Sequence, residues 1–299
     1  MATAQPGGVR LDGRVAIVTG AGAGLGRRYA EQLAARGARV VVNDVQRDAA
    51  DEVAAGIRAA GGRAIADGNT AATPDGGAAI VAAAAGEFGA VDAVVANAGI
   101  VRRGGFDELS ADDIRAGLAV NLEGAIWVTR AAFPLMKAQR RGRIVLVTSS
   151  AGIYGHSVGA NYCASKGGVV GLLRALAIEG DGHGVRANAI SPFALTPMTS
   201  TTPGLTPDVA AQLDPDQVAP VAVYLASDEC AVNGQILAVA GGTVARTFSA
   251  TTVGWRTAPG TMVTPESVRD NMAQILDPAG AAMPAKVRDE RDHLLSAEG

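Results

Sequence analysis

The fold of this chain is decided by residues 15–26, which read Val-Ala-Ile-Val-Thr-Gly-Ala-Gly-Ala-Gly-Leu-Gly. The apolar run that opens the stretch predicts a buried strand, and the pattern from Arg27 to Arg36 predicts a helix that Gly37 ends. The glycine cluster between them allows the backbone to turn tightly and to approach a pyrophosphate, which the helix N-terminus attracts. The stretch therefore predicts the first strand, turn and helix of a nucleotide-binding α/β fold.

The same alternation continues along the chain. We expect strands at 39–42, 63–66, 91–96, 143–148, 185–190 and 236–239, and helices at 47–60, 74–88, 111–137, 162–179 and 215–227. This spacing predicts right-handed βαβ units in one doubly wound parallel sheet with helices on both faces. We expect residues 1–245 to form this Rossmann-type domain. Residues 246–299 are less regular and are expected to form a C-terminal extension, with a helix near 265–276.

The composition excludes several classes of function. The chain has 299 residues, of which 48% are hydrophobic, and a net charge of −3 without a basic block, so nucleic acid is not an expected partner. The two cysteines cannot form a disulfide framework, and the three histidines have no metal-ligand spacing, so no metal site is expected. Residues 1–10 contain no apolar leader, and no apolar stretch reaches the ~18 residues of a membrane span. We therefore expect a cytoplasmic protein without membrane association.

The second strand predicts the choice of cofactor. Asp44 follows this strand, 18 residues after Gly26, where an acid accepts hydrogen bonds from the adenosine ribose and repels a 2′-phosphate. The pattern therefore favours NAD over NADP. Two alternatives stay open: Asp44 as an ordinary acid at a strand end, and Arg27 and Arg28 as partners of a 2′-phosphate.

The ends of the third and fourth strands complete the expected adenosine site. Small residues in Asn97-Ala98-Gly99 allow the ribose to lie against bare backbone, and Asp67 is placed to accept a hydrogen bond from the adenine amine. The alternative for Asp67 is a simple turn residue. The expected cofactor contacts in this half are Gly20, Gly24, Leu25, Gly26, Asp44, Asp67, Gly68, Asn97, Ala98 and Gly99.

A Tyr-x3-Lys pair supplies the candidate chemistry. The four-residue spacing places Tyr162 and Lys166 on one helix face. A phenol, with a pKa of about 10, becomes a useful base for an alcohol proton when an ammonium and a cationic nicotinamide stabilise its phenolate. Lys166 is expected to supply that charge and, with Tyr162, to contact the cofactor. Ser149 is expected to bind the substrate oxygen, and Ser150 is the alternative for this role. Asn121 is expected to kink the long helix and to hold a water that relays protons to Lys166.

These residues resemble the short-chain dehydrogenase/reductase family. The motifs that fall in family order are Thr19-x3-Gly-x-Gly, Asn97-Ala98-Gly99, Asn121, Ser149, Tyr162-x3-Lys166 and Pro192. The resemblance implies a Rossmann-fold homodimer or homotetramer formed through the long helices. It also implies a cofactor contact at Pro192.

A closer resemblance extends over about residues 10–276. The stretches 41–44, 148–155, 176–180, 214–220 and 255–257 look like the (3R)-hydroxyacyl-CoA dehydrogenase modules of peroxisomal multifunctional enzymes. This implies NAD-dependent oxidation of a (3R)-3-hydroxyacyl-CoA to the 3-ketoacyl thioester, and a nicotinamide contact at Thr196. The chain departs from the pattern at Ala96 and Phe193, where the family has asparagine and glycine. We also expect no fused module and no peroxisomal signal.

Three other functions fit the same motifs. The first is a dehydrogenase of a steroid, a terpene or another free secondary alcohol that uses the same residues. The second is a ketoacyl-carrier reductase, which Asp44 disfavours because such reductases usually use NADPH. The third is a regulator that senses NAD without turnover, which would not need to retain Ser149, Tyr162 and Lys166.

Overall fold

The computed structural model describes residues 8–157, 159–200 and 206–295. Internal contacts divide the chain into two compact units, Met1–Arg246 and Thr247–Gly299. The larger unit carries the sheet and every residue of the candidate site.

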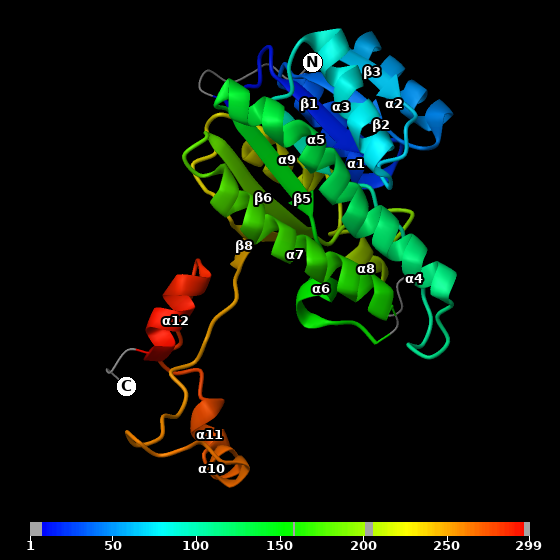
Figure 1. The fold of residues 1–299 in the computed structure, drawn as a ribbon. Coiled ribbons are helices and arrows are strands. Elements are labelled where there is room, and N and C mark those ends of the chain that lie inside the picture. Colours follow the sequence, from blue (N-terminus) through cyan, green and yellow to red (C-terminus); the bar gives the residue numbers. More distant parts are fainter. Residues whose placement is uncertain (1–7, 158, 201–205, 296–299) are drawn as a thin grey trace. The chain divides into compact units, whose positions relative to one another are not determined.

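An eight-stranded sheet forms the centre of the larger unit, in the order β3-β2-β1-β4-β5-β6-β7-β8 (Figure 1). The strands are β1 (Val15–Thr19), β2 (Arg39–Asn43), β3 (Arg63–Asp67), β4 (Ala93–Ala96), β5 (Gly142–Val147), β6 (Val185–Pro192), β7 (Ile236–Ala240) and β8 (Thr243–Thr247). Strands β1 to β7 pair in parallel. The strand order reverses between β1 and β4, and ligands of such sheets bind beyond the carboxyl ends of the strands at this point.

Helices cover both faces of the sheet, as the alternating pattern predicts. Those of the larger unit are α1 (Gly24–Ala35), α2 (Arg47–Ala59), α3 (Pro74–Phe88), α4 (Ala111–Leu118), α5 (Gly124–Gln139), α6 (Ser150–Tyr154), α7 (Ala160–Gly180), α8 (Pro207–Ala210) and α9 (Ala219–Ala226), with a 3-10 turn, η2 (Pro215–Gln217). One core cluster joins α1, α2 and α9 to the sheet, and the other joins α3, α5 and α7 to the opposite face (Figure 1). Along β1, Ala16 and Val18 belong to the first cluster and Val15 and Ile17 to the second, because successive side chains point to opposite faces.

The long helix predicted at 111–137 is interrupted in the structure. It consists of α4, a π-helical turn η1 (Ala119–Glu123) and α5. A π-turn accommodates one extra residue in an otherwise regular helix and occurs frequently at functional sites. Asn121 lies within this turn, where the sequence predicted a kink.

Two elements were not predicted from the sequence: α6, which lies beside the candidate site, and β8, which lies at the edge of the sheet. Helix α6 follows β5 directly, and β8 follows β7 after Gly241 and Gly242. Both glycines have positive φ values, 52° and 76°. A two-residue connection of this kind joins antiparallel strands, so β8 departs from the predicted all-parallel sheet.

The smaller unit contains short helices and little sheet. Its helices are α10 (Pro265–Asp270), α11 (Met272–Ile275) and α12 (Val287–Leu295), and Thr251 forms a β-bridge with Ala282. Thr264 caps α10 in a capping box with Ser267. Within the part of the chain that the structure describes, no helix has the length and apolarity to cross a bilayer, and no group of three or more His, Cys, Asp or Glu side chains is arranged to bind a metal.

Candidate active site

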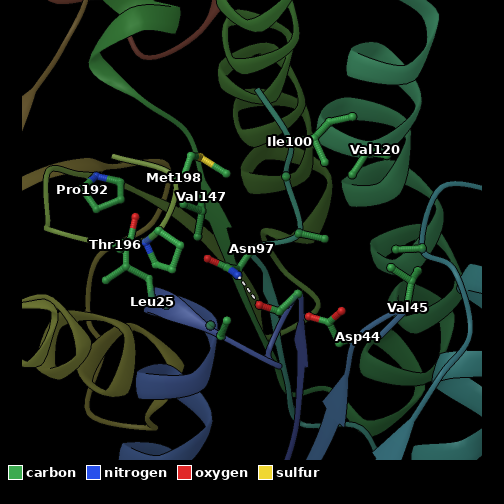
Figure 2. Close-up of a pocket in the computed structure, with 18 of the residues that line it drawn as sticks. Leu25, Asp44, Val45, Asn97, Ile100, Val120, Val147, Pro192, Thr196 and Met198 are labelled. Carbon is green, nitrogen blue, oxygen red and sulfur yellow. Dashed lines mark hydrogen bonds between the residues drawn. The ribbon is translucent and has the colours of Figure 1, made fainter. Parts of the chain in front are cut away.

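A cavity of about 400 Å³ lies at the carboxyl edge of the sheet. It contains twelve of the predicted residues, namely Gly20, Gly24, Leu25, Gly26, Asp44, Asn97, Ala98, Gly99, Tyr162, Lys166, Pro192 and Thr196. Figure 2 shows Asp44 and Val45 on one side of this cavity and Pro192, Thr196 and Met198 on the other. The cavity therefore brings the predicted adenosine residues and the predicted catalytic pair into one continuous space.

The glycine loop is shaped by its contact with the end of β4. Gly20 and Gly24 have φ values of 63° and 54°, which favour glycine. A Cβ at Gly20 would lie 2.8 Å from the Cα of Ala98, so a larger residue does not fit there. The Asn97 side chain donates hydrogen bonds to the carbonyl oxygens of Thr19 and Gly20, both at 3.0 Å. Asn97 thus fixes the loop to β4.

The N-terminus of α1 faces the cavity at Gly24 and Leu25. Its N-cap residue, Ala23, makes no side-chain capping bond, and the first turn contains no acid. The backbone N–H groups of this turn lack intrahelical acceptors and carry the positive end of the helix dipole. This arrangement, together with the small loop residues, fits the pyrophosphate of a dinucleotide.

Asp44 is held at the end of β2 by the backbone around it. The N–H of Gly22 donates to one carboxylate oxygen at 3.0 Å, and the N–H of Gln46 donates to the other at 2.9 Å. The carboxylate is half-buried and lines the cavity. Its position is therefore fixed by the chain's own backbone.

The two arginines considered as partners of a 2′-phosphate bind carboxylates of the chain. Arg27 pairs with Glu31 at 2.9 Å and with Glu52 at 3.0 Å. Arg28 pairs with Glu31 at 2.9 Å and with Asp216 at 3.4 Å. Neither arginine lines the cavity.

Asp67 and Gly68 do not line the cavity, although both are predicted to contact the cofactor. Asp67 is buried, and its carboxylate accepts hydrogen bonds from the side chain of Asn43 at 2.7 Å and from the backbone and side chain of Asn69 at 3.0 Å and 2.8 Å. Residues 70–72 form the cavity wall in this region instead. The adenine contact of Asp67 stays a prediction.

Tyr162 and Lys166 lie on successive turns of α7. The Lys166 Nζ lies 5.9 Å from the centroid of the Tyr162 ring and donates a hydrogen bond to the carbonyl oxygen of Val147 at 2.7 Å. Ser149 is the N-cap of α6, and its hydroxyl accepts from the N–H of Ala151 at 3.2 Å. Ser149 also forms a side-chain hydrogen bond with Tyr162, whereas the alternative candidate, Ser150, is exposed.

Burial governs the ionisation of the pair. Burial raises the pKa of Tyr162, and the hydrogen bond with Ser149 acts in the opposite direction. Burial lowers the pKa of Lys166 to about 8, so its ammonium is still mostly protonated at neutral pH. The sequence predicted that Lys166 would lower the pKa of the phenol. In the structure the pKa of Tyr162 is raised instead, because the loss of water around the phenolate outweighs the hydrogen bond with Ser149.

Asn121 is buried beside the cavity rather than in its wall. Its side chain accepts from the N–H of Ile100 at 2.7 Å and donates to the carbonyl of Ile100 at 2.9 Å. It also donates to the hydroxyl of Ser165 at 3.1 Å. Asn121 therefore joins the segment after β4 to α7, and its predicted role in holding a water stays a prediction.

The segment after β6 forms part of the cavity wall. Pro192 ends β6, and the N–H of Thr196 donates to the hydroxyl of Thr199 at 2.8 Å. That hydroxyl donates in turn to the carbonyl of Ala194 at 2.5 Å. A Cβ on Gly24 would lie 3.6 Å from the Cβ of Thr196, so this turn packs against the glycine loop, and both segments line the cavity.

Several residues of the cavity wall were not predicted. They are Ala23, Asn43, Val45, Gln46, Thr70, Ala71, Ala72, Ile100, Val120, Val147, Thr148, Ala194, Pro197, Met198 and Thr199. Most follow the carboxyl end of a strand, so the predicted sheet already places them at this edge. Their side chains carry no motif, which is why the sequence did not single them out.

Comparison with known proteins places these features in a family. A family model described as short chain dehydrogenase matches residues 14–205. A short-chain type dehydrogenase/reductase of Mycobacterium tuberculosis is 48% identical over 78% of this chain and 84% of its own length. Mouse peroxisomal multifunctional enzyme type 2 is 40% identical over 97% of this chain and 41% of its own length.

A solved structure gives the same result for the fold. The full-length peroxisomal multifunctional enzyme type 2 from Drosophila melanogaster matches with a TM-score of 0.83 and 37% identity, over 96% of this chain and 49% of that chain. The predicted Rossmann-type fold and both resemblances are confirmed. This chain spans less than half of the two multifunctional proteins.

Proposed function

The chain belongs to the short-chain dehydrogenase family, and on this basis we propose that it is an NAD-dependent dehydrogenase of (3R)-3-hydroxyacyl-CoA thioesters. The family makes it an oxidoreductase that acts on the CH–OH group of a small-molecule substrate. The proposal adds the cofactor, the substrate class and the roles of individual residues.

One observation carries the proposal: a single cavity is lined both by Asp44 and by the Tyr162–Lys166 pair. The fixed carboxylate of Asp44 suits two ribose hydroxyls and repels a 2′-phosphate. Arg27 and Arg28 pair with carboxylates and do not line the cavity, so neither is placed to bind that phosphate. These contacts support NAD over NADP.

The chain's own residues account for proton movement. When bound, the nicotinamide would supply the acceptor for the hydride that leaves the carbinol carbon. Ser149 donates a hydrogen bond to the substrate oxygen and orients the carbinol, and Tyr162 removes the hydroxyl proton as the ketone forms. Lys166 stabilises the phenolate and holds the nicotinamide ribose, and its contact with Val147 keeps the ammonium beside the ring. To restore the phenolate, Lys166 would release its own proton to solvent through a water that Asn121 holds and would then take up the proton that Tyr162 received.

The proposed substrate class, a hydroxyacyl-CoA, follows from the resemblance. The exposed apolar side chains at the carboxyl edge of the sheet agree with it. Phe193, Leu195 and Met198 follow β6 at the carboxyl edge of the sheet, and each is partly exposed. Tyr154, at the end of α6, is also exposed at this edge. Exposed apolar groups around a cleft mark a binding surface, and an acyl chain matches their chemistry.

A cofactor and substrate screen tests the proposal. NADH formation is measured with (3R)- and (3S)-3-hydroxyacyl-CoA thioesters of several chain lengths and with free secondary alcohols, and each reaction is repeated with NADP. We expect the highest kcat/KM for a (3R)-thioester with NAD. A higher kcat/KM for a free alcohol would reject the thioester, and a preference for NADP would reject the role of Asp44.

The proposed enzyme is a homodimer or homotetramer. Leu135 on α5 and Ile178 on α7 are apolar and partly exposed, and the two helices cover the same face of the sheet. Their pairing with a second copy would bury these side chains. Light scattering after size exclusion measures the subunit number, and a monomer at micromolar concentration would contradict this part.

A further inference from the structure

Both backbone polar groups of Tyr162 are held by buried side chains of its own helix. The Tyr162 N–H donates to the side-chain oxygen of Asn161 at 2.8 Å. The hydroxyl of Ser165 donates to the carbonyl oxygen of Tyr162 at 2.9 Å. Asn161 is 4% exposed and Ser165 is 0% exposed, so water does not compete with either hydrogen bond.

These two side chains are themselves anchored to other elements. The amide nitrogen of Asn161 donates to the carbonyl oxygen of Asp113 in α4 at 3.3 Å. The hydroxyl of Ser165 accepts from the amide nitrogen of Asn121 in η1 at 3.1 Å. The backbone of Tyr162 is therefore connected to two points outside α7.

The start of α7 explains why such support is needed. Its N-cap is Gly159, which makes no side-chain capping bond and has a φ of 133°. Tyr162 is the third residue of the helix, and the N–H at this position has no intrahelical acceptor. A capping serine or aspartate usually accepts from it. Here Asn161 takes this role from inside the helix.

We propose that Asn161 and Ser165 are positioning residues that set the place of the Tyr162 phenol for proton transfer. The inference rests on the proposed function, because it assigns the phenol the role of base. A misplacement of about 1 Å at a reacting group lowers the rate up to about 100-fold. Neither residue lines the cavity, and they act through the backbone of Tyr162.

The chain offers a closely matched control for Ser165. Ser227 is 0% exposed, and its hydroxyl donates to the carbonyl oxygen of Tyr224, three residues earlier, at 2.8 Å. Ser165 and Ser227 thus make the same kind of hydrogen bond to a tyrosine carbonyl, but Ser227 lies outside the cavity wall. The variants Ser165→Ala and Ser227→Ala remove equivalent groups.

Steady-state kinetics with the best alcohol substrate of the wild type provides the main test. We expect Ser165→Ala to lower kcat at least tenfold, to shift the pH dependence of kcat, and to leave the Kd for NAD unchanged. Ser165→Thr, which keeps the hydroxyl, is expected to recover most of kcat, and Ser227→Ala to keep the wild-type kcat. A wild-type kcat and pH profile for Ser165→Ala would overturn the proposal, as would an equal loss of kcat in Ser227→Ala.

A second measurement does not depend on turnover. The phenolate absorbance of Tyr162 is isolated by subtracting the pH titration of Tyr162→Phe, and it is followed in the wild type and in Asn161→Ser. We expect the midpoint of this titration to move in Asn161→Ser, because a displaced ring changes its burial and its hydrogen bond with Ser149. An unchanged midpoint overturns the positioning role, whereas a wild type that oxidises no secondary alcohol contradicts the proposed function alone.

Discussion

The ammonium of Lys166 donates a hydrogen bond to the carbonyl oxygen of Val147 at 2.7 Å. The next residue of that segment, Thr148, donates its hydroxyl to the backbone carbonyl of Lys166, also at 2.7 Å. Lys166 is thus attached at its side chain and at its backbone to the end of β5. The lysine is held in place by the sheet, and this agrees with a fixed charge beside the Tyr162 ring.

Because Lys166 is buried, we expect the free energy of unfolding to depend on pH. Burial lowers the pKa of Lys166 from 10.5 to about 8. Between these values the folded state has lost the proton that the unfolded state still binds, so the free energy of unfolding rises with pH. The shift corresponds to about 3 kcal/mol. Relative to Lys166→Met, the wild type is expected to gain up to this amount between pH 7 and pH 10.5.

Urea unfolding at several pH values measures this difference. Subtracting the free energy of unfolding of Lys166→Met from that of the wild type at each pH removes the effect of the titratable groups that the two proteins share. Lys137→Met, a change at an exposed lysine of α5, serves as the control. If the wild type and Lys166→Met differ in their free energy of unfolding by the same amount from pH 7 to pH 10.5, Lys166 keeps its ordinary pKa.

The base assignment predicts the effect of removing one oxygen. Tyr162→Phe keeps the ring but loses the group that accepts the alcohol proton, so we expect kcat to fall by about 10²- to 10⁴-fold. The Kd for NAD, measured by quenching of protein fluorescence, is expected to stay near the wild-type value. Activity within tenfold of the wild type would mean that another group removes the proton.

Two substitutions of Asp44 separate the effect of its negative charge from the effect of its hydrogen bonds with the backbone. Asp44→Ala removes the negative charge and the acceptors of the Gly22 and Gln46 N–H groups, whereas Asp44→Asn removes the charge and keeps an amide oxygen as an acceptor. We expect both variants to lower the ratio of kcat/KM for NAD to that for NADP at least tenfold. Only Asp44→Ala is expected to lose stability as well. A ratio unchanged in Asp44→Asn would remove the carboxylate from the ribose site.

At Gly152, the backbones of α6 and α7 pack too closely to leave room for a side chain. A Cβ at Gly152 would lie 2.5 Å from the backbone carbon of Lys166 and 2.6 Å from the nitrogen of Gly167. Backbone atoms cannot move aside as a flexible side chain does, so Gly152→Ala is expected to displace α6 together with Ser149. We expect a loss of about 1–3 kcal/mol in stability and a fall of at least tenfold in kcat.

The control for this variant lies in α2. No atom lies within 4 Å of a Cβ built on Gly56, which is exposed, so Gly56→Ala should stabilise the protein by about 0.5–1 kcal/mol without loss of activity. Thermal unfolding and initial rates measure both variants. Wild-type activity in Gly152→Ala would show that the spacing of α6 and α7 does not set the position of Ser149.

The sequence predicted those features that depend on short-range pattern. The apolar strands and the alternation of elements identify the sheet, because a strand buried on both faces must be apolar throughout. The glycine loop, Asp44 and the Tyr162–Lys166 spacing could be placed on this sheet, since each lies at the end of a strand or the start of a helix. All of them line the cavity.

Features that depend on contacts distant in sequence were not predicted. The kink at Asn121 was predicted, but its hydrogen bonds with Ile100 and Ser165, which are 21 and 44 residues away, were not. The ionisation of Lys166 depends on burial, which the spacing of residues does not report. For the same reason Asn161 and Ser165 carried no signal: their importance arises from what they touch in the folded chain.

The π-turn has a consequence for insertions and deletions. Each residue of a regular helix advances the chain by about 100° around the axis. Removing one residue from η1 would restore ordinary helical winding and rotate α4 by about that angle relative to α5. The carbonyl of Asp113, which Asn161 requires, would then point in another direction. The length of this short segment is therefore more constrained than the identity of most of its side chains, and homologues should vary there by substitution rather than by gaps.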